Sequence, residues 1–311
     1  MSRFKRVLSS VEVLEKLSYL DFTKSISRME KDPFDQGAHA NIFLAQLGGV
    51  RVCVRVLRLV GTMVDERDKE RLHQSALTEL AIWSSLCHKN VLPFYGYSTS
   101  PGPSLAFICL HVPAGNAHKY MLSNPSVDRL AFVAELGEGL VYLHSRGIVH
   151  GDLKGANILV WVLESSAFPT PLLCDFGSAK VLDIPGSSCI SGGTTNWMAK
   201  ELLGDSDDAY ISPGSDIWAW GMTVYELVTD KVPYSDMQIK PLVLLRKIID
   251  GTLPSPPDAL AAHRGLNSEM WALLQSCWAS EVPSRPSAEF VVSETWRIHA
   301  QWLEEKNGSM S

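Results

Sequence analysis

The segment His150–Asn157, with the sequence HGDLKGAN, carries the most informative chemistry in the chain. An acid, Asp152, is followed two residues later by Lys154 and five residues later by Asn157. Transfer of a phosphoryl group to a hydroxyl needs a group that orients the hydroxyl and accepts its proton, a cation that stabilises the phosphate, and a metal ligand. These three side chains supply that set. The alternative is a helix-to-strand loop in which the Asp and the Asn only form turns.

A second acidic residue, Asp175, follows this segment in the sequence, and several further short motifs come after it. Asp175 opens the sequence DFG directly after a short apolar run at 172–174 that is predicted to be a strand. Mg²⁺ favours sites with one or two carboxylates plus substrate phosphates, so Asp175 is a candidate ligand beside Asn157. The later blocks are TTNWMAKE at 194–201, SDIWAWG at 215–221, Cys277-Trp278 and Arg285-Pro286.

Composition excludes several classes of protein. The 311 residues include 46% hydrophobic and 20% charged residues and carry a net charge of −6, which is typical of a folded chain without a nucleic-acid footprint. No apolar run reaches the roughly 18 to 20 residues of a membrane helix. The six cysteines contain no CxxC pair, which argues against a zinc site and against a disulfide framework. We therefore expect a soluble, cytoplasmic protein in a reducing compartment.

The pattern along the chain predicts an α+β fold with a small β-rich part before a larger helical one. A helix is expected at 9–20, a hairpin at 42–59 around Gly48-Gly49, a helix at 64–87, and strands at 91–97 and 105–112. A helix at 126–144, ended by Gly147, opens the second part. A small hairpin at 157–174 comes next, and the later helices are expected at 215–229, 241–250, 267–278 and 287–303.

Taken in this order, the blocks resemble a eukaryotic protein kinase domain over roughly residues 28–300. The segments CWASEVPSRPS and GTTNWMAKE resemble the tyrosine-kinase-like branch of the serine/threonine kinases, of the type found in fungi. The resemblance implies a bilobal fold with an N-lobe at 28–110 and a C-lobe at 111–300. A helical extension at 1–27 and a tail at 301–311 would flank the domain.

The resemblance also implies a role for each residue of the blocks in the C-lobe. It implies ATP as cofactor with Mg²⁺ or Mn²⁺, and Lys154 is the residue that serine/threonine kinases carry at its position. The implied roles are Asp152 as base, Lys154 as charge stabiliser, Thr194 as positioning group, Asn157 and Asp175 as metal ligands, and Glu201 with Arg285 as a structural ion pair.

The N-lobe departs from the family pattern in two places. The strand lysine of the family falls on Arg55, in the sequence VCVR, and its acidic partner would be Glu79. The glycine-rich phosphate loop maps to DQGAHANI at 35–42, which keeps only the middle glycine. The implied nucleotide-binding residues are Gly37, Ile42, Arg55 and Glu79, together with Cys109 at the back of the adenine pocket and Leu110 and Val112 in the hinge.

Three functions fit these observations. The first is an ATP-dependent serine/threonine protein kinase. The second is a pseudokinase that acts as a nucleotide-binding or scaffolding module, motivated by Arg55, Asp35, Ala40 and Lys200. The third, based on His150-Gly151-Asp152, is a small-molecule phosphotransferase, which the later blocks disfavour. We expect a monomer that acts on a protein substrate, with the N-terminal helix as a site for a partner, and no nucleic-acid or membrane role.

Overall fold

The computed structural model of the protein describes residues 10–27, 29–36, 40–58, 66–100, 105–163, 168–182, 194–204 and 210–308. The chain divides into two compact units. The first comprises the residues up to Cys87 together with Val91–Pro113, and the second comprises His88–Asn90 and the residues from Ala114 onward. A β-rich unit followed by a helical one agrees with the α+β expectation. The predicted domain boundaries after residues 27, 110 and 300 stay predictions.

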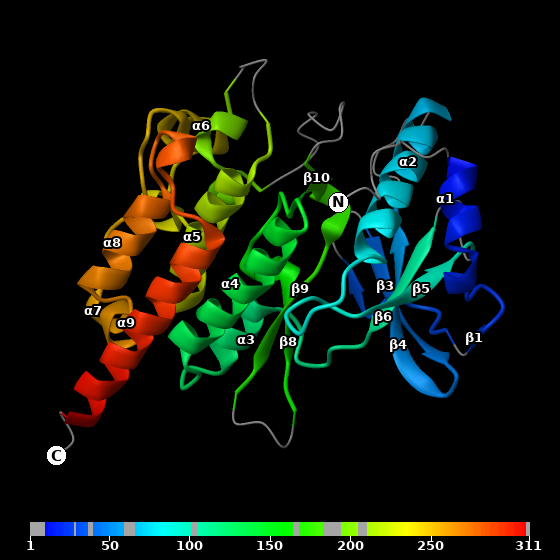
Figure 1. Ribbon diagram of the computed structural model, residues 1–311, viewed down its shortest axis with the longest axis horizontal. Coiled ribbons are helices and arrows are strands. Elements are labelled where there is room, and N and C mark those ends of the chain that lie inside the picture. Colours follow the sequence, from blue (N-terminus) through cyan, green and yellow to red (C-terminus); the bar gives the residue numbers. More distant parts are fainter. Residues whose placement is uncertain are drawn as a thin grey trace. The chain divides into compact units, whose positions relative to one another are not determined.

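The first unit is built on an antiparallel sheet (Figure 1). Its strands have the order β1-β3-β4-β6-β5, and β2 also pairs with β3. Consecutive positive φ angles at Gly48 (57°) and Gly49 (84°) form the tight turn between β3 and β4, which confirms the predicted hairpin. The strand bounds are β1 Ile26–Ser27, β2 Asp35–Gln36, β3 Ala40–Leu47, β4 Val50–Leu57, β5 Phe94–Ser98 and β6 Ala106–Leu110.

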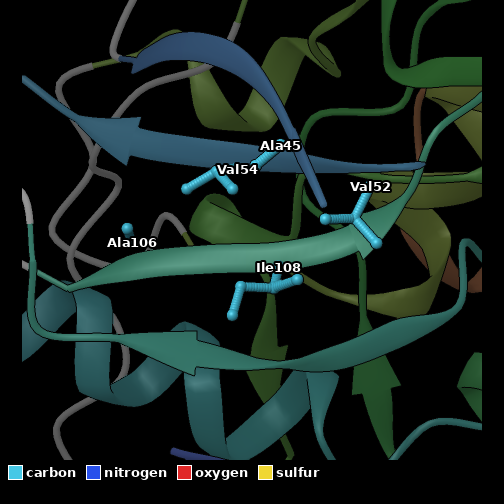
Figure 2. Close-up of a cluster of buried hydrophobic side chains, with 5 residues drawn as sticks. All are labelled: Ala45, Val52, Val54, Ala106 and Ile108. Carbon is cyan, nitrogen blue, oxygen red and sulfur yellow. The ribbon is translucent and has the colours of Figure 1, made fainter. Parts of the chain in front are cut away.

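The two faces of this sheet have different surroundings. On one face, small and branched side chains of β3, β4 and β6 form a buried hydrophobic cluster of Ala45, Val52, Val54, Ala106 and Ile108 (Figure 2). Residues between them along the strands point to the other face, because strand side chains alternate. There the helix α2, Glu66–Trp83, contributes Trp83, whose ring lies 5.0 Å from Phe94 and 6.1 Å from Phe107.

The N-terminal residues belong to the first unit. The helix α1, Ser10–Lys16, packs against α2, and the short 3₁₀ helix η1, Ser18–Leu20, packs against β5. Gly96 of β5 permits this contact, since a Cβ there would lie 2.3 Å from the carbonyl oxygen of Leu20. The predicted helix at 9–20 is therefore present as two short helices that cover part of the sheet unit.

The second unit is mostly helical, with two small strand pairs (Figure 1). The helix α4 packs against α9 and β9, and α5 packs against α8. The helices are α3 Ala117–Ser123, α4 Arg129–Ser145, α5 Pro213–Thr229, α6 Pro241–Ile249, α7 Ala259–His263, α8 Ser268–Cys277 and α9 Ala288–Gly308. The pairs are β7 Ile148–Val149 with β10 Lys180–Val181, and β8 Ile158–Trp161 with β9 Thr170–Leu173. The 3₁₀ helices are η2 Gly155–Asn157, η3 Phe176–Ser178, η4 Thr195–Trp197, η5 Lys200–Leu202, η6 Ser235–Met237 and η7 Val282–Ser284.

The helix α5 is the buried centre of this unit. Its N-terminus is fixed by a capping box, in which Ser212 and Ser215 each accept the backbone N–H of the other. Pro213 stands in its first turn, where a missing N–H costs nothing. Every residue from Ser215 to Thr229 is buried, so the helix presents groups to neighbours on all sides.

The short helices α3 and α7 lie outside the sequence predictions. Each is fixed by an N-cap side chain, which is Asn116 for α3 and Asp258 for α7. Within the described residues, no helix combines the length and the apolar character that crossing a membrane requires.

Candidate active site

The segment His150–Asn157 lies in the second unit, between β7 and β8, and a buried carboxylate anchors its start. Asp216 of α5 accepts the backbone N–H of His150 at 2.8 Å and of Gly151 at 2.9 Å, and it also contacts the His144 ring at 2.9 Å. Gly151 has φ of 79°, and a Cβ there would meet the carbonyl oxygen of Ser178 at 2.6 Å. Glycine is thus required at this turn on both conformational and steric grounds.

The polar side chains of the segment converge on Asp152. The amine of Lys154 donates to Oδ2 of Asp152 at 2.5 Å and to the Thr194 hydroxyl at 2.6 Å. The hydroxyl of Thr194 lies 3.3 Å from Oδ1 of Asp152, and it donates to that oxygen. Asn157 donates its amide N–H to Oδ2 at 2.9 Å and to the Asp152 carbonyl at 2.8 Å. The structure therefore brings four sequence-predicted residues into one cluster.

His150 connects this cluster to the second acid. Its side chain is buried, accepts the N–H of Asp152 at Nδ1 (3.3 Å), and donates from Nε2 to the carbonyl of Cys174 (3.1 Å). The adjacent Asp175 has φ of 64° and ψ of 73°, a left-handed conformation that is uncommon outside glycine. Phe176 is buried next to it, with its ring 5.4 Å from that of His150. Strain of this kind is typical of functional positions.

Asn157 and Asp175 occupy the same end of a hairpin. The strands β8 and β9 pair Ile158 with Leu173, and the N–H of Cys174 donates to the carbonyl of Asn157 at 3.1 Å. An amide oxygen and a carboxylate at one hairpin end are ligands that Mg²⁺ accepts when phosphates complete its coordination. Among the described residues there is no cluster of three or more His, Cys, Asp or Glu side chains arranged for a metal.

A second buried carboxylate of α5 holds the other end of the segment. Glu226 accepts the backbone N–H of Gly155 at 2.9 Å and the indole N–H of Trp197 at 2.8 Å. The His118 ring contacts its other oxygen at 2.8 Å, and this hydrogen bond raises the pKa of His118. Sequence spacing assigned no role to Asp216, Glu226 or His118, because all of these contacts join residues far apart in the chain.

The buried side chain of Arg285 makes an ion pair with the partly exposed Glu201 elsewhere in this unit. Its guanidinium donates to both oxygens of Glu201, each at 2.7 Å, and to the carbonyls of Gly214 and Ala279, each at 3.0 Å. It also lies 5.0 Å from the ring centre of Trp218. This geometry is the two-pronged contact that a guanidinium forms with a carboxylate.

The residues predicted to bind nucleotide lie in the first unit. Arg55 of β4 donates to Glu79 of α2 at 2.7 Å, with the two side chains 13% and 3% exposed. Ile42 of β3 stands directly opposite Arg55. Cys109 and Leu110 lie at the end of β6, and Val112 follows as a buried residue. Gly37, which is also predicted to bind nucleotide, lies outside the described residues.

The comparisons with known proteins agree with this geometry. Residues 49–297 match the family model of the protein kinase domain. The chain belongs to the protein kinase domain family. Protein kinase domains in general use ATP and a divalent metal ion, and they act on protein substrates.

The curated relatives are protein kinases. MAP3K epsilon protein kinase 1 of Arabidopsis thaliana is 32% identical over 228 residues, which is 71% of this chain and 15% of that protein. Mitogen-activated protein kinase kinase kinase 1 of the same plant is 36% identical over 216 residues, 68% of this chain and 32% of that protein. Serine/threonine-protein kinase CTR1, also from Arabidopsis thaliana, is 28% identical over 266 residues, 83% of this chain and 30% of that protein. The chain thus spans a third or less of the length of these relatives.

Proposed function

We propose that this domain is a serine/threonine protein kinase of the tyrosine-kinase-like branch, which transfers the γ-phosphate of ATP to hydroxyl groups of proteins. The observation that carries the proposal is the cluster of Asp152, Lys154, Thr194 and Asn157. Relatives named as serine/threonine kinases support it. Catalysis of phosphoryl transfer consists mainly of positioning and electrostatic stabilisation, and this cluster supplies both.

Each member of the cluster has a distinct role in the proposal. Asp152 orients the acceptor hydroxyl and accepts its proton, while Asn157 holds the carboxylate in place through its amide N–H. Lys154 lies against Asp152 and Thr194, where its charge would stabilise the transferring phosphate. Thr194 fixes the second oxygen of Asp152.

Asn157 and Asp175 are the residues that would hold the divalent cation. A bound Mg²⁺ or Mn²⁺ neutralises charge on the nucleotide phosphates. The left-handed backbone at Asp175 turns the chain sharply at the end of the hairpin at which Asn157 also lies. The contact of His150 with the Cys174 carbonyl fixes the position of this acid relative to the base.

Arg55 takes the place of the strand lysine in the proposal. It keeps the positive charge and the contact with Glu79, so the phosphate-positioning pair is retained in altered form. A guanidinium is planar and larger than an ammonium, and a displacement of about 1 Å in such a group costs on the order of 100-fold in rate. This substitution favours a second candidate, a pseudokinase that binds nucleotide without transferring phosphate.

The test is transfer of labelled γ-phosphate, with Mg²⁺ or Mn²⁺, to a generic basic protein and to the chain itself. We expect label with the unmodified protein and none with Asp152→Asn, which removes the base and keeps the shape of the side chain. Asp250→Asn, at an exposed position after α6, is the matched control and retains transfer. Absence of label in a protein that still binds ATP overturns the proposal in favour of the pseudokinase.

A further inference from the structure

Two buried cysteines face each other across neighbouring strands of the first unit. Cys53 of β4 is directly opposite Cys109 of β6, and the two residues are 7% and 5% exposed. They are separated in the sequence by a helix and a strand, so no spacing rule for cysteines detects them. The sequence argument against a disulfide framework therefore does not apply to this pair.

The side chains of both cysteines lie on the same face of the sheet. The next cross-strand pair on that face is Arg55 with Phe107, and the guanidinium lies 5.8 Å from the ring centre. The intervening Val54 and Ile108 point the other way, into the hydrophobic cluster of Figure 2. Since strand side chains alternate with a period of two, Cys53 and Cys109 project together on the face that carries Arg55.

This register matches the geometry of a disulfide. Residues directly opposite each other in an antiparallel pair have Cα atoms roughly 4.5 to 5.5 Å apart. A disulfide forms across Cα separations of roughly 4.4 to 6.8 Å, and this range includes both of those values. The thiol of Cys109 is also hydrogen-bonded to that of Cys53, and this bond lowers the pKa of Cys53. A thiolate at Cys53 is the nucleophilic form.

We propose that Cys53 and Cys109 form a modification site at which a peroxide oxidises the two thiols to an intramolecular disulfide. The Cys53 thiolate attacks one oxygen of hydrogen peroxide, which forms a sulfenic acid and releases hydroxide. The sulfur of Cys109 then displaces the sulfenic oxygen, its proton leaves with that oxygen as water, and the S–S bond forms. Two thiols and one peroxide give one disulfide and two waters, and the peroxide takes up both electrons. A dithiol reductant reverses the reaction by exchange.

We expect bound nucleotide to slow the oxidation of Cys53 and Cys109, and this part of the proposal rests on the proposed function. The resemblance to protein kinases implies that Cys109 lies at the back of the adenine pocket and that Leu110 and Val112 lie in the hinge beside it. Bound ATP would then cover the pair and restrict oxidation to the fraction of protein without nucleotide. At an ATP concentration ten times its Kd, oxidation should slow by about tenfold.

The experiment uses the full, reduced chain treated with hydrogen peroxide, with and without ATP. Intact mass spectrometry should show loss of two hydrogens, and a non-reducing peptide map should join the peptides that contain Cys53 and Cys109. Cys53→Ala should abolish the cross-link. Cys109→Ser tests the other cysteine of the pair. If Cys109→Ser does not fold, the result with Cys53→Ala decides the test. Cys87→Ser, at an exposed cysteine, is the matched control and keeps the cross-link.

The outcomes separate this inference from the proposed function. If peroxide oxidises the exposed Cys87 completely while no Cys53–Cys109 peptide forms, the modification site is refuted. If the cross-link forms at the same rate with saturating ATP, the position of the pair beside the nucleotide is refuted. If the reduced protein does not bind ATP at all, the proposed function fails, and the peptide map alone then decides on the thiol site.

Discussion

Removal of Glu201 should destabilise the second unit far more than removal of an exposed charge. The Arg285 side chain is 0% exposed, whereas that of Glu201 is 24% exposed. Glu201→Ala leaves the guanidinium buried against Trp218 with two carbonyl contacts but without a counter-charge. Breaking a buried pair in this way costs about 3–5 kcal/mol, and the partial exposure of Glu201 points to the lower end.

Thermal denaturation followed by tryptophan fluorescence measures the effect. For a unit of this size, 1 kcal/mol corresponds to roughly 2–4 °C, so about 3 kcal/mol predicts a fall in Tm of about 6–12 °C. The matched control is Lys231→Ala, because its ion pair with Asp258 has side chains 51% and 50% exposed. Exposed pairs of this kind contribute about 0–1 kcal/mol.

A double variant tests the physical reason for the effect. Once Arg285→Met has removed the buried charge, the further change Glu201→Ala should cost little, so the two effects should not add. The reasoning is refuted if Glu201→Ala lowers Tm no more than Lys231→Ala does. It is equally refuted if the two substitutions are additive.

Three further predictions concern other parts of the protein. Arg55→Met should abolish phosphate transfer, and it should lower the free energy of unfolding of the first unit by about 3–5 kcal/mol because Glu79 is only 3% exposed. Arg55→Lys should keep the fold. Kinase assays measure the transfer, and urea unfolding measures the stability. The pKa of His118 is raised in the folded protein, so its contribution to stability is complete below the unfolded pKa near 6.5 and is lost as pH rises through the higher folded value. When Tm is measured from pH 5 to pH 9, it should therefore fall more with rising pH in the unmodified protein than in His118→Gln. Parallel curves for the two proteins would contradict this. Gly221→Ala should lower stability by about 1–3 kcal/mol despite the better helix propensity of alanine, because its Cβ would lie 2.7 Å from the Trp278 indole nitrogen; a rise in Tm would show that the neighbour moves away.

The pattern of residues alone predicted features whose causes are local, whereas the distant pairs Arg55–Glu79 and Glu201–Arg285 were implied only by the resemblance to protein kinases. The two glycines at 48 and 49 define a turn within a few residues, and Gly147, with φ of 69°, ends α4 where the helix pattern stops. The cluster around Asp152 was predictable in the same way, since three of its four members lie within the segment 150–157. Local spacing limits which side chains meet, and residue type indicates their chemistry.

The features that sequence missed depend on contacts between distant segments. No residue near His118 in the sequence indicates its contact with the buried Glu226, which lies 108 residues further along the chain. The pairing of Cys53 with Cys109 arises from strand order, with β4 beside β6 rather than β5. Short helices such as α3 and α7 contain too few turns for a periodic pattern to identify them.

The geometry of the active-site segment is fixed by the helix that lies beneath it. Asp216, near the start of α5, binds the backbone N–H groups of His150 and Gly151, and Glu226, further along the same helix, binds that of Gly155. Two buried carboxylates of one rigid helix thus hold both sides of the turn that presents Asp152. The helix is buried from Ser215 to Thr229, and close packing of this kind leaves the two carboxylates little room to move. In the proposed function Asp152 must meet its substrate within a fraction of an ångström, and these two carboxylates would give it the support that this requires without touching the substrate themselves.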